Sequence, residues 1–396
     1  MIENFNLINY TFTKNNKMKK IILILSLFTL SVSLNAQIAV GSYEENGRIK
    51  DFKDGSYEKL LKTTTIFVFS NVNDKAFYES ILNETWTLTP YEIVDYKEFS
   101  PLDYFSEDYS FCILKAYKNE SLYHSYLELY MYDMERINKI FGKVKWEKLD
   151  ERQTIGKKFT VSMENQISFG KIYFYAQAEL FKNLPPFSGM SYGKTKGLGY
   201  NAAQMKSSTY VVPDGAYLYY MGYSKQDEKI EHLKTMHESF YNDKVHFNYE
   251  KGFISNYFQQ FTKQMKSKEL SSKTENFSSP QLSKLKNNTL YIPEYVQISY
   301  DGWKILDTQM SKSDISKVMA GYKYKYEFIS TEALDEKINA GEEIYYLNYS
   351  RITATQIFQI INAKTGKPVF KMKTADFKYN IGPKNFEKMS KVISES

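Results

Sequence analysis

One ten-residue pattern occurs three times in this chain of 396 residues and constrains its fold more than any other feature. Each copy runs from an apolar residue through Lys, two small polar residues and Thr to three apolar residues and a strand-ending residue. Such a pattern predicts a short polar turn that leads into a buried strand. The three copies are Leu61–Ser70, Met205–Asp214 and Leu285–Glu294.

The first and third copies continue in the same way. Each is followed by an amphipathic helix, then by one of the similar strands Tyr91–Asp95 and Tyr326–Ser330, then by antiparallel strands and a closing helix. We therefore predict an α/β fold, with α+β as the alternative, built from tandem β-α-β-β-β(-α) modules with mixed sheets. The first and third modules are duplicated and the middle copy is degenerate. In this alignment Ile66–Phe69 corresponds to Leu290–Pro293.

The repeats and the polar stretches between them predict four parts. The Ser- and Lys-rich residues 267–284 are the best linker, and the polar residues 142–165 are a weaker one. The predicted parts are an extension plus signal peptide at 1–36, a first α/β module at 37–150, a middle β-hairpin and helical region at 151–270, and a third α/β module at 275–396.

The N-terminal part has the pattern of an export leader. A positive start at Met18 precedes a mostly apolar run, 21–34, and the small residue Ala36 stands before Gln37. This order is typical of a secretory signal peptide, and the run is shorter than the roughly 20 residues that span a bilayer. We expect Met18 to be the true start and cleavage near Gln37, which would place the protein in the periplasm, at the cell surface or in the medium. A retained anchor is the alternative.

The charge pattern argues against nucleic acid as a partner. The chain has a formal net charge of +6, and half of that charge belongs to residues 1–36. Nearly all of its 52 basic residues are lysines, which lack the planar fork that reads phosphates and guanines. We therefore expect no nucleic-acid partner and no stable membrane insertion after leader cleavage. The arginines are Arg48, Arg136, Arg152 and Arg351.

The sequence contains no motif typical of catalysis or metal binding. The single cysteine, Cys112, lies in an apolar strand-like run and is expected to be a buried, inert thiol. His232 and His237 are five residues apart, whereas a helical zinc pair needs a spacing of four. His124 and His246 have no carboxylate or thiol at motif spacing. We expect no catalytic residue, no cofactor and no metal.

Two further features approach functional motifs but favour structural roles. Ser188–Thr195 approximates a phosphate-binding loop, yet no apolar strand leads into it and no apolar helix follows. Glu92 and Glu327 occupy matching strands of the first and third copies. A carboxylate that is present in both copies favours a role in the fold over a role as general acid. The long loop Phe187–Asn201 is a candidate binding loop.

The 35 tyrosines supply core material and a candidate binding surface. We expect ligand or partner contacts at Tyr192, Tyr200 and Tyr220, and at position 218, where Leu218 lies within the same tyrosine-rich run as Tyr220. The sequence favours an exported, soluble cell-envelope protein that binds an envelope protein or a glycan and catalyses nothing. The alternative is a secreted hydrolase of the glycoside or ester type, whose carboxylate pair forms only in the tertiary structure.

Overall fold

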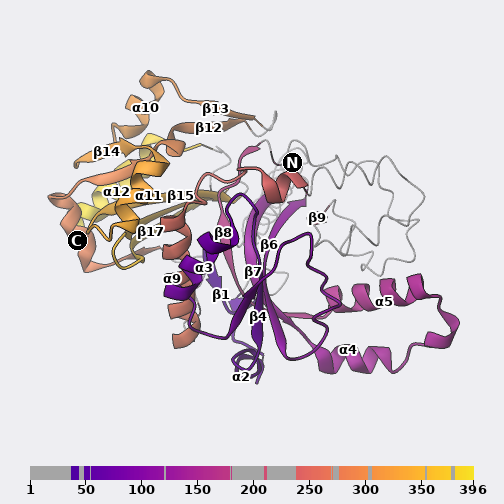
Figure 1. Cartoon of the computed structure of the whole chain (residues 1–396). Helices are drawn as coiled ribbons and strands as arrows, with labels where there is room; N and C mark the ends of the chain where they lie inside the picture. The colour runs from indigo at the N-terminus through magenta and orange to yellow at the C-terminus, as the bar shows by residue number, and fades with distance from the viewer. Residues whose placement is uncertain are drawn as a thin grey trace, which may run out of the picture.

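Two mixed β-sheets with helices packed against them form the fold (Figure 1). The mixed α/β class predicted from the sequence is confirmed. The computed structural model describes residues 37–43, 49–53, 55–119, 122–178, 180, 209–211, 238–268, 270, 276–301, 306–352, 355–375 and 380–396.

The first sheet has the strand order β1-β8-β7-β6-β4-β5, and β9 pairs with β6. β5 and β6 are both parallel to β4, whereas β6, β7, β8 and β1 pair antiparallel in turn. Its elements are β1 (Ile38–Val40), α2 (Ser56–Leu60), β4 (Thr64–Val68), α3 (Lys75–Thr85), β5 (Tyr91–Ile93), β6 (Tyr109–Asn119), β7 (Leu122–Tyr132), β8 (Gln166–Phe174) and β9 (Thr209–Val211).

The second sheet repeats this order as β10-β17-β16-β15-β11-β14. β14 and β15 are parallel to β11, and β15, β16, β17 and β10 pair antiparallel in turn. The elements are β10 (Phe277–Ser278), η4 (Pro280–Lys286), β11 (Leu290–Pro293), α10 (Lys312–Met319), β14 (Tyr326–Ile329), β15 (Tyr345–Ile352), β16 (Thr355–Asn362), β17 (Lys367–Ala375) and α12 (Pro383–Glu395).

The correspondence between the two sheets differs from the predicted one by one residue. Thr65 pairs with the first residue of β5, and Leu290 pairs with the first residue of β14. Thr65 is therefore the counterpart of Leu290, and the predicted match of Ile66–Phe69 with Leu290–Pro293 is wrong by one position.

Buried residues before each strand explain this shift. Leu60 in α2 and Leu285 in η4 are both fully buried, and each lies five residues before the residue that pairs with β5 or β14. Lys62 and Lys286, which matched the two copies in the sequence, are exposed. Packing of the leucines fixes the register, because an exposed lysine places little constraint on it.

The same register continues across the remaining strands. Three residues paired across neighbouring strands of the first sheet correspond to three such residues in the second sheet. In both sheets the pairing register shifts just after the residue that follows the central one of the three, between Leu129 and Tyr130 and between Ile360 and Ile361. β-Bulges are conserved features of a fold, so a bulge at the same step supports this correspondence. The three residues are Ile113, Glu128 and Lys171 in the first sheet, and Asn348, Gln359 and Lys371 in the second.

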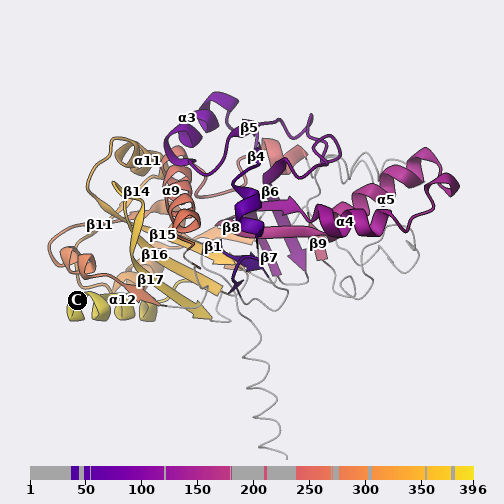
Figure 2. The same cartoon turned by 90° about the horizontal axis from the view of Figure 1, so that it is seen from below.

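The connection between the last two strands differs between the two units. β16 and β17 form a hairpin, whereas β7 and β8 are joined through α4 (Met134–Phe141) and α5 (Glu151–Glu164). These helices extend away from the first sheet (Figures 1 and 2). The prediction of a linker over residues 142–165 is wrong, because Asp150 and Gln153 form a capping box at the start of α5.

The second unit has its own additions. β12 (Ile298–Asp301) and β13 (Leu306–Gln309) form a hairpin before α10, and α11 (Thr331–Asn339) follows β14. Ser330 caps α11 by accepting a hydrogen bond from the N–H of Ala333. β10 and the start of η4 also lie within the predicted linker 267–284.

The middle copy of the pattern lies mostly outside the described residues. Of Met205–Asp214 only Thr209–Val211 is described, and it joins the first sheet as β9. The region 151–270 also supplies α5, β8 and α9 (Lys251–Ser267). Its role as a separate domain stays a prediction.

α9 packs between the two sheets (Figure 2). Phe258 contacts Phe67 of β4 with a ring distance of 5.8 Å, and Phe253 contacts Tyr346 of β15 at 5.3 Å. Gly170 permits the close approach of α9 to the first sheet, because a Cβ there would collide with the backbone of β1 and an aromatic ring of α9. The tyrosine-rich aromatic clusters of the core therefore span both sheets.

A buried polar network also connects the two sheets. Gln37 Nε2 donates to the Tyr257 hydroxyl at 2.6 Å, and Asn348 Nδ2 donates to Gln37 Oε1 at 2.6 Å. Asn248 Nδ2 donates to the same hydroxyl at 2.8 Å. All four side chains are buried. Buried polar groups with satisfied partners favour one packing arrangement over others.

Candidate functional site

The histidine and cysteine of the core are engaged in the fold. Cys112 is a buried free thiol whose pKa is raised by burial. Burial lowers the pKa of His246 to about 3, so this imidazole is neutral near pH 7. Its Nε2 lies 2.8 Å from the Ser125 Oγ, but both side chains are buried and Ser125 donates to the Lys115 carbonyl. The Ser–His contact is thus closed to substrate.

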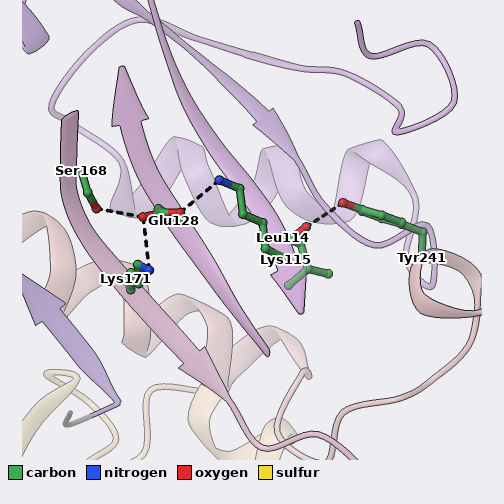
Figure 3. Close-up of polar contacts among 6 residues, drawn as sticks. All are labelled: Leu114, Lys115, Glu128, Ser168, Lys171 and Tyr241. Atoms are coloured by element: carbon green, nitrogen blue, oxygen red, sulfur yellow. Dashed lines mark hydrogen bonds and ion pairs between the residues drawn. The ribbon is translucent and has the colours of Figure 1, made fainter. Parts of the chain in front are cut away.

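A buried ion cluster ties three strands of the first sheet together (Figure 3). Glu128 lies 3.0 Å from the Lys115 ammonium and 3.3 Å from that of Lys171, and it accepts a hydrogen bond from Ser168. Burial by itself raises the pKa of Glu128, but the two ammonium groups outweigh burial and lower it to about 2. Both carboxylate oxygens are paired, so the cluster has a structural role.

The crevice at the carboxyl ends of β4 and β6 is the usual place for a ligand in an open α/β sheet. Here residues 238–250 fill it. The Tyr241 carbonyl accepts from the Asn71 N–H and the Ser70 hydroxyl, and the Tyr241 hydroxyl donates to the Leu114 carbonyl at 2.6 Å (Figure 3). The remaining cavity of about 120 Å³ is smaller than ordinary ligand pockets.

A larger hollow lies at the opposite end of the first sheet. Its volume of about 540 Å³ is within the range of ligand sites. α2, the segment before β6, the end of β7 and the start of α4 surround it. The lining residues are Lys53, Ser56, Lys59, Phe105, Ser106, Glu107, Met131, Tyr132, Asp133, Met134, Glu135, Asn138 and Ile167.

Asp133 organises this hollow. Its Oδ1 accepts from the Arg136 N–H and caps α4, while its Oδ2 lies 2.7 Å from the Lys53 ammonium. Burial by itself raises the pKa of Asp133, but the hydrogen bonds from Lys53 and from the Arg136 N–H outweigh burial and lower it. The carboxylate therefore stays ionised at neutral pH and holds Lys53 at the rim.

Exposed charges of both signs surround an apolar floor in the hollow. Lys59, Glu107 and Glu135 are exposed, whereas Met131 and Tyr132 are buried. An apolar centre with a polar rim is typical of recognition surfaces. The arrangement suits a partner that presents both donors and acceptors.

The predicted tyrosine surface lies outside the described residues and stays a prediction. Glu92 and Glu327 take equivalent, exposed positions in β5 and β14, and their predicted role in the fold stays a prediction. His124 lies near the start of β7, whereas the end of that strand lines the hollow. The residues outside the described part of the chain are Tyr192, Tyr200, Leu218, Tyr220, His232, His237 and the loop Phe187–Asn201.

Sequence reasoning missed the hollow because its parts are far apart in the chain. Lys53 and Asp133 are separated by 80 residues. One local signal exists, since Asp133 directly precedes an amphipathic helix and is a good N-cap. That signal predicts a cap and does not predict a rim for ligand binding.

No family model, curated protein or solved structure matches this chain. No helix in the described ranges is long and apolar enough to cross a membrane. Over the same ranges no three His, Cys, Asp or Glu side chains are grouped as they would be to hold a metal ion. The hollow is therefore the feature of the described residues that indicates a function.

Proposed function

We propose that this chain is an exported protein that binds a partner at the hollow between α2 and α4 and catalyses no reaction. The hollow carries the proposal, because it combines a ligand-sized volume with an apolar floor and a rim of mixed charge. An envelope protein or a glycan offers the matching donors and acceptors.

The state of the titratable groups supports a binding role over catalysis. A general acid needs a carboxyl group that remains protonated near the working pH. Asp133 is held ionised by Lys53 instead. His246 and Cys112 are buried away from the hollow, so neither is available as a base or nucleophile there.

Export rests on the leader-like residues 18–36. Cleavage before Gln37 would leave the buried network of Gln37, Tyr257 and Asn348 complete. Intact-mass measurement of the secreted protein tests this part, since a mass that still includes residues 18–36 would contradict it.

A hydrolase of the glycoside or ester type is the second candidate. Glu107, Asp133 and Glu135 all line the same hollow, and glycoside hydrolases use two carboxylates on either side of the bond. Turnover of chromogenic glycosides or esters that disappears in Glu107→Gln or Glu135→Gln would favour this candidate. Absence of turnover with intact partner binding favours the binding protein.

Site-specific photo-crosslinking in cells that make the full chain tests partner binding. A crosslinking residue replaces the exposed Asn138 of the hollow, and a matched control replaces the exposed Lys388 on α12. We expect a discrete crosslinked product from position 138 only. A second substitution, Lys59→Glu, should lower the yield of this product. Equal products from both positions, or none from position 138, would contradict the proposal.

A further inference from the structure

The second sheet contains a buried arginine that makes no ion pair with any described residue. Arg351, near the end of β15, is only 5% exposed. Its Nη1 is buried without a hydrogen-bond partner, and within the described ranges no carboxylate forms an ion pair with it. Buried charges in proteins are normally paired, so this guanidinium requires an explanation.

Aromatic stacking offsets part of the cost of burying Arg351. The guanidinium carbon lies 3.4 Å from the ring centroid of Tyr300 and 5.6 Å from that of Tyr175. A cation–π contact stabilises a cation by less than the desolvation of an unpaired charge costs. An additional anion would restore the balance.

The carboxylate of Asp307 forms no direct ion pair with Arg351 among the described residues. Burial raises the pKa of Tyr175, and Asp307 raises it further while Arg351 lowers it, so both charges act on this phenol. However, Asp307 Oδ2 accepts a hydrogen bond from the Ala178 N–H at 2.6 Å and makes no ion pair with Arg351 in the described part of the chain. Tyr175 stays neutral and able to donate.

The position of Arg351 in the sheet also favours ligand binding. From β11 the chain passes to β14 on one side and then to β15 on the other, so the carboxyl ends of β11 and β15 form a topological switch point. Arg351 lies at the carboxyl end of β15. Its counterpart in the first sheet is Ala116, beside the crevice that residues 238–250 fill.

We propose that Arg351 binds an oxyanion, the carboxylate or phosphate of a small molecule, beside the rings of Tyr175 and Tyr300. The planar guanidinium presents parallel N–H donors that match both groups. The site goes beyond the proposed partner binding, because Arg351 belongs to the other sheet and the site shares no residue with the hollow. Failure at one site therefore leaves the other untouched.

Thermal unfolding of the full mature chain tests the site. About 20 mM sodium acetate or inorganic phosphate, compared with chloride at equal ionic strength, should raise the Tm of wild type by roughly 2–4 °C. Arg351→Gln should remove this shift, whereas Arg136→Gln, which changes an exposed arginine of α4, should retain it. A shift with acetate and phosphate identifies a carboxylate-type ligand, and a shift with phosphate alone identifies a phosphoryl ligand.

Equal shifts in wild type and Arg351→Gln, or no shift in wild type, would overturn the proposal. If Arg351→Gln does not fold, crystals of the wild-type protein grown with selenate decide the matter by anomalous scattering. We expect a selenium peak within hydrogen-bond distance of the Arg351 guanidinium. Crystals with selenate bound elsewhere, and none at Arg351, would equally overturn it.

Discussion

The two sheets have the same strand order and pairing register, but corresponding positions carry different side chains. Glu128 of the first sheet corresponds to Gln359 of the second, and Lys171 corresponds to Lys371. Glu128 is paired with two lysines, whereas Gln359 Oε1 is buried without a partner in the described part of the chain. We infer a duplication in which strand order, register and bulge persisted while the side chains diverged.

The helices that correspond in the two units also differ in their surroundings. α12 follows β17 directly, whereas β9 lies between β8 and α9 in the chain, and each helix packs beside the crossover helix of its own unit, α3 or α10. α9 is buried on most of its faces because the second sheet covers it. α12 exposes a charged outer face. α9 thus contacts both sheets, whereas one face of α12 is exposed.

Truncation of a core ring in each helix should give the largest effects. Phe258→Ala in α9 and Phe386→Ala in α12 each remove a fully buried ring, and each should lower the free energy of unfolding by about 3–5 kcal/mol. Urea unfolding followed by circular dichroism measures this change. α9 contacts more of the molecule than α12 does. A loss of unfolding free energy in Phe258→Ala that is well below the loss in Phe386→Ala would therefore contradict the proposed difference between the two helices.

Removal of the Glu128 charge should have the next largest effect. Glu128→Gln leaves Lys115 and Lys171 without their counter-charge, and we expect a loss of about 3 kcal/mol in the free energy of unfolding. Glu327→Gln, which changes an exposed carboxylate, is the matched control and should change stability by less than about 0.5 kcal/mol. Similar losses in both variants would contradict the structural role of the cluster.

The same cluster predicts an acid-dependent loss of stability in the first sheet. The folded pKa of Glu128 is about 2, below the ordinary value of 4.5. Its contribution is therefore fully present above about pH 4.5 and is lost as the pH falls toward 2. Stability measured across that range should fall more steeply in wild type than in Glu128→Gln. Parallel curves would show that Glu128 is not the cause.

The smallest expected effect concerns the cap of α4, an element that only the first unit has. Asp133→Ala removes both the cap and the partner of Lys53, and we expect a loss of about 1 kcal/mol. Lys53→Ala removes only the ion pair and should cost between 0 and about 1 kcal/mol. Thermal melts of both variants measure the difference. A larger loss for Lys53→Ala would mean that the ion pair, not the cap, orders the hollow.

Local patterns allowed much of the fold to be predicted from the sequence. Apolar periodicity located the helix after the first copy of the pattern, which Asp74 caps in the structure, and apolar runs bounded by turns located the strands. The register was missed, since it depends on burial of Leu60 and Leu285 and not on the repeated lysine. α5 was missed because its apolar pattern is weak and its start depends on the reciprocal capping box of Asp150.

The candidate sites depend on contacts that are distant in the sequence. The hollow needs α2 beside α4, and the oxyanion site needs the ring of Tyr175 beside Arg351 of β15. The scarcity of arginine was visible in the sequence, but burial of Arg351 was not. Periodicity reports which face of an element is buried, and it does not report which side chains meet across elements.

Native-state hydrogen exchange of wild type and Phe258→Ala tests most directly whether α9 joins the two copies. If α9 supports both sheets, Phe258→Ala should reduce amide protection in β6 and β7 and also in β15 and β16, while Phe386→Ala should reduce it mainly in β15 and β16. Loss of protection in the first sheet alone after Phe258→Ala would contradict the account, because the two copies would then be independent units.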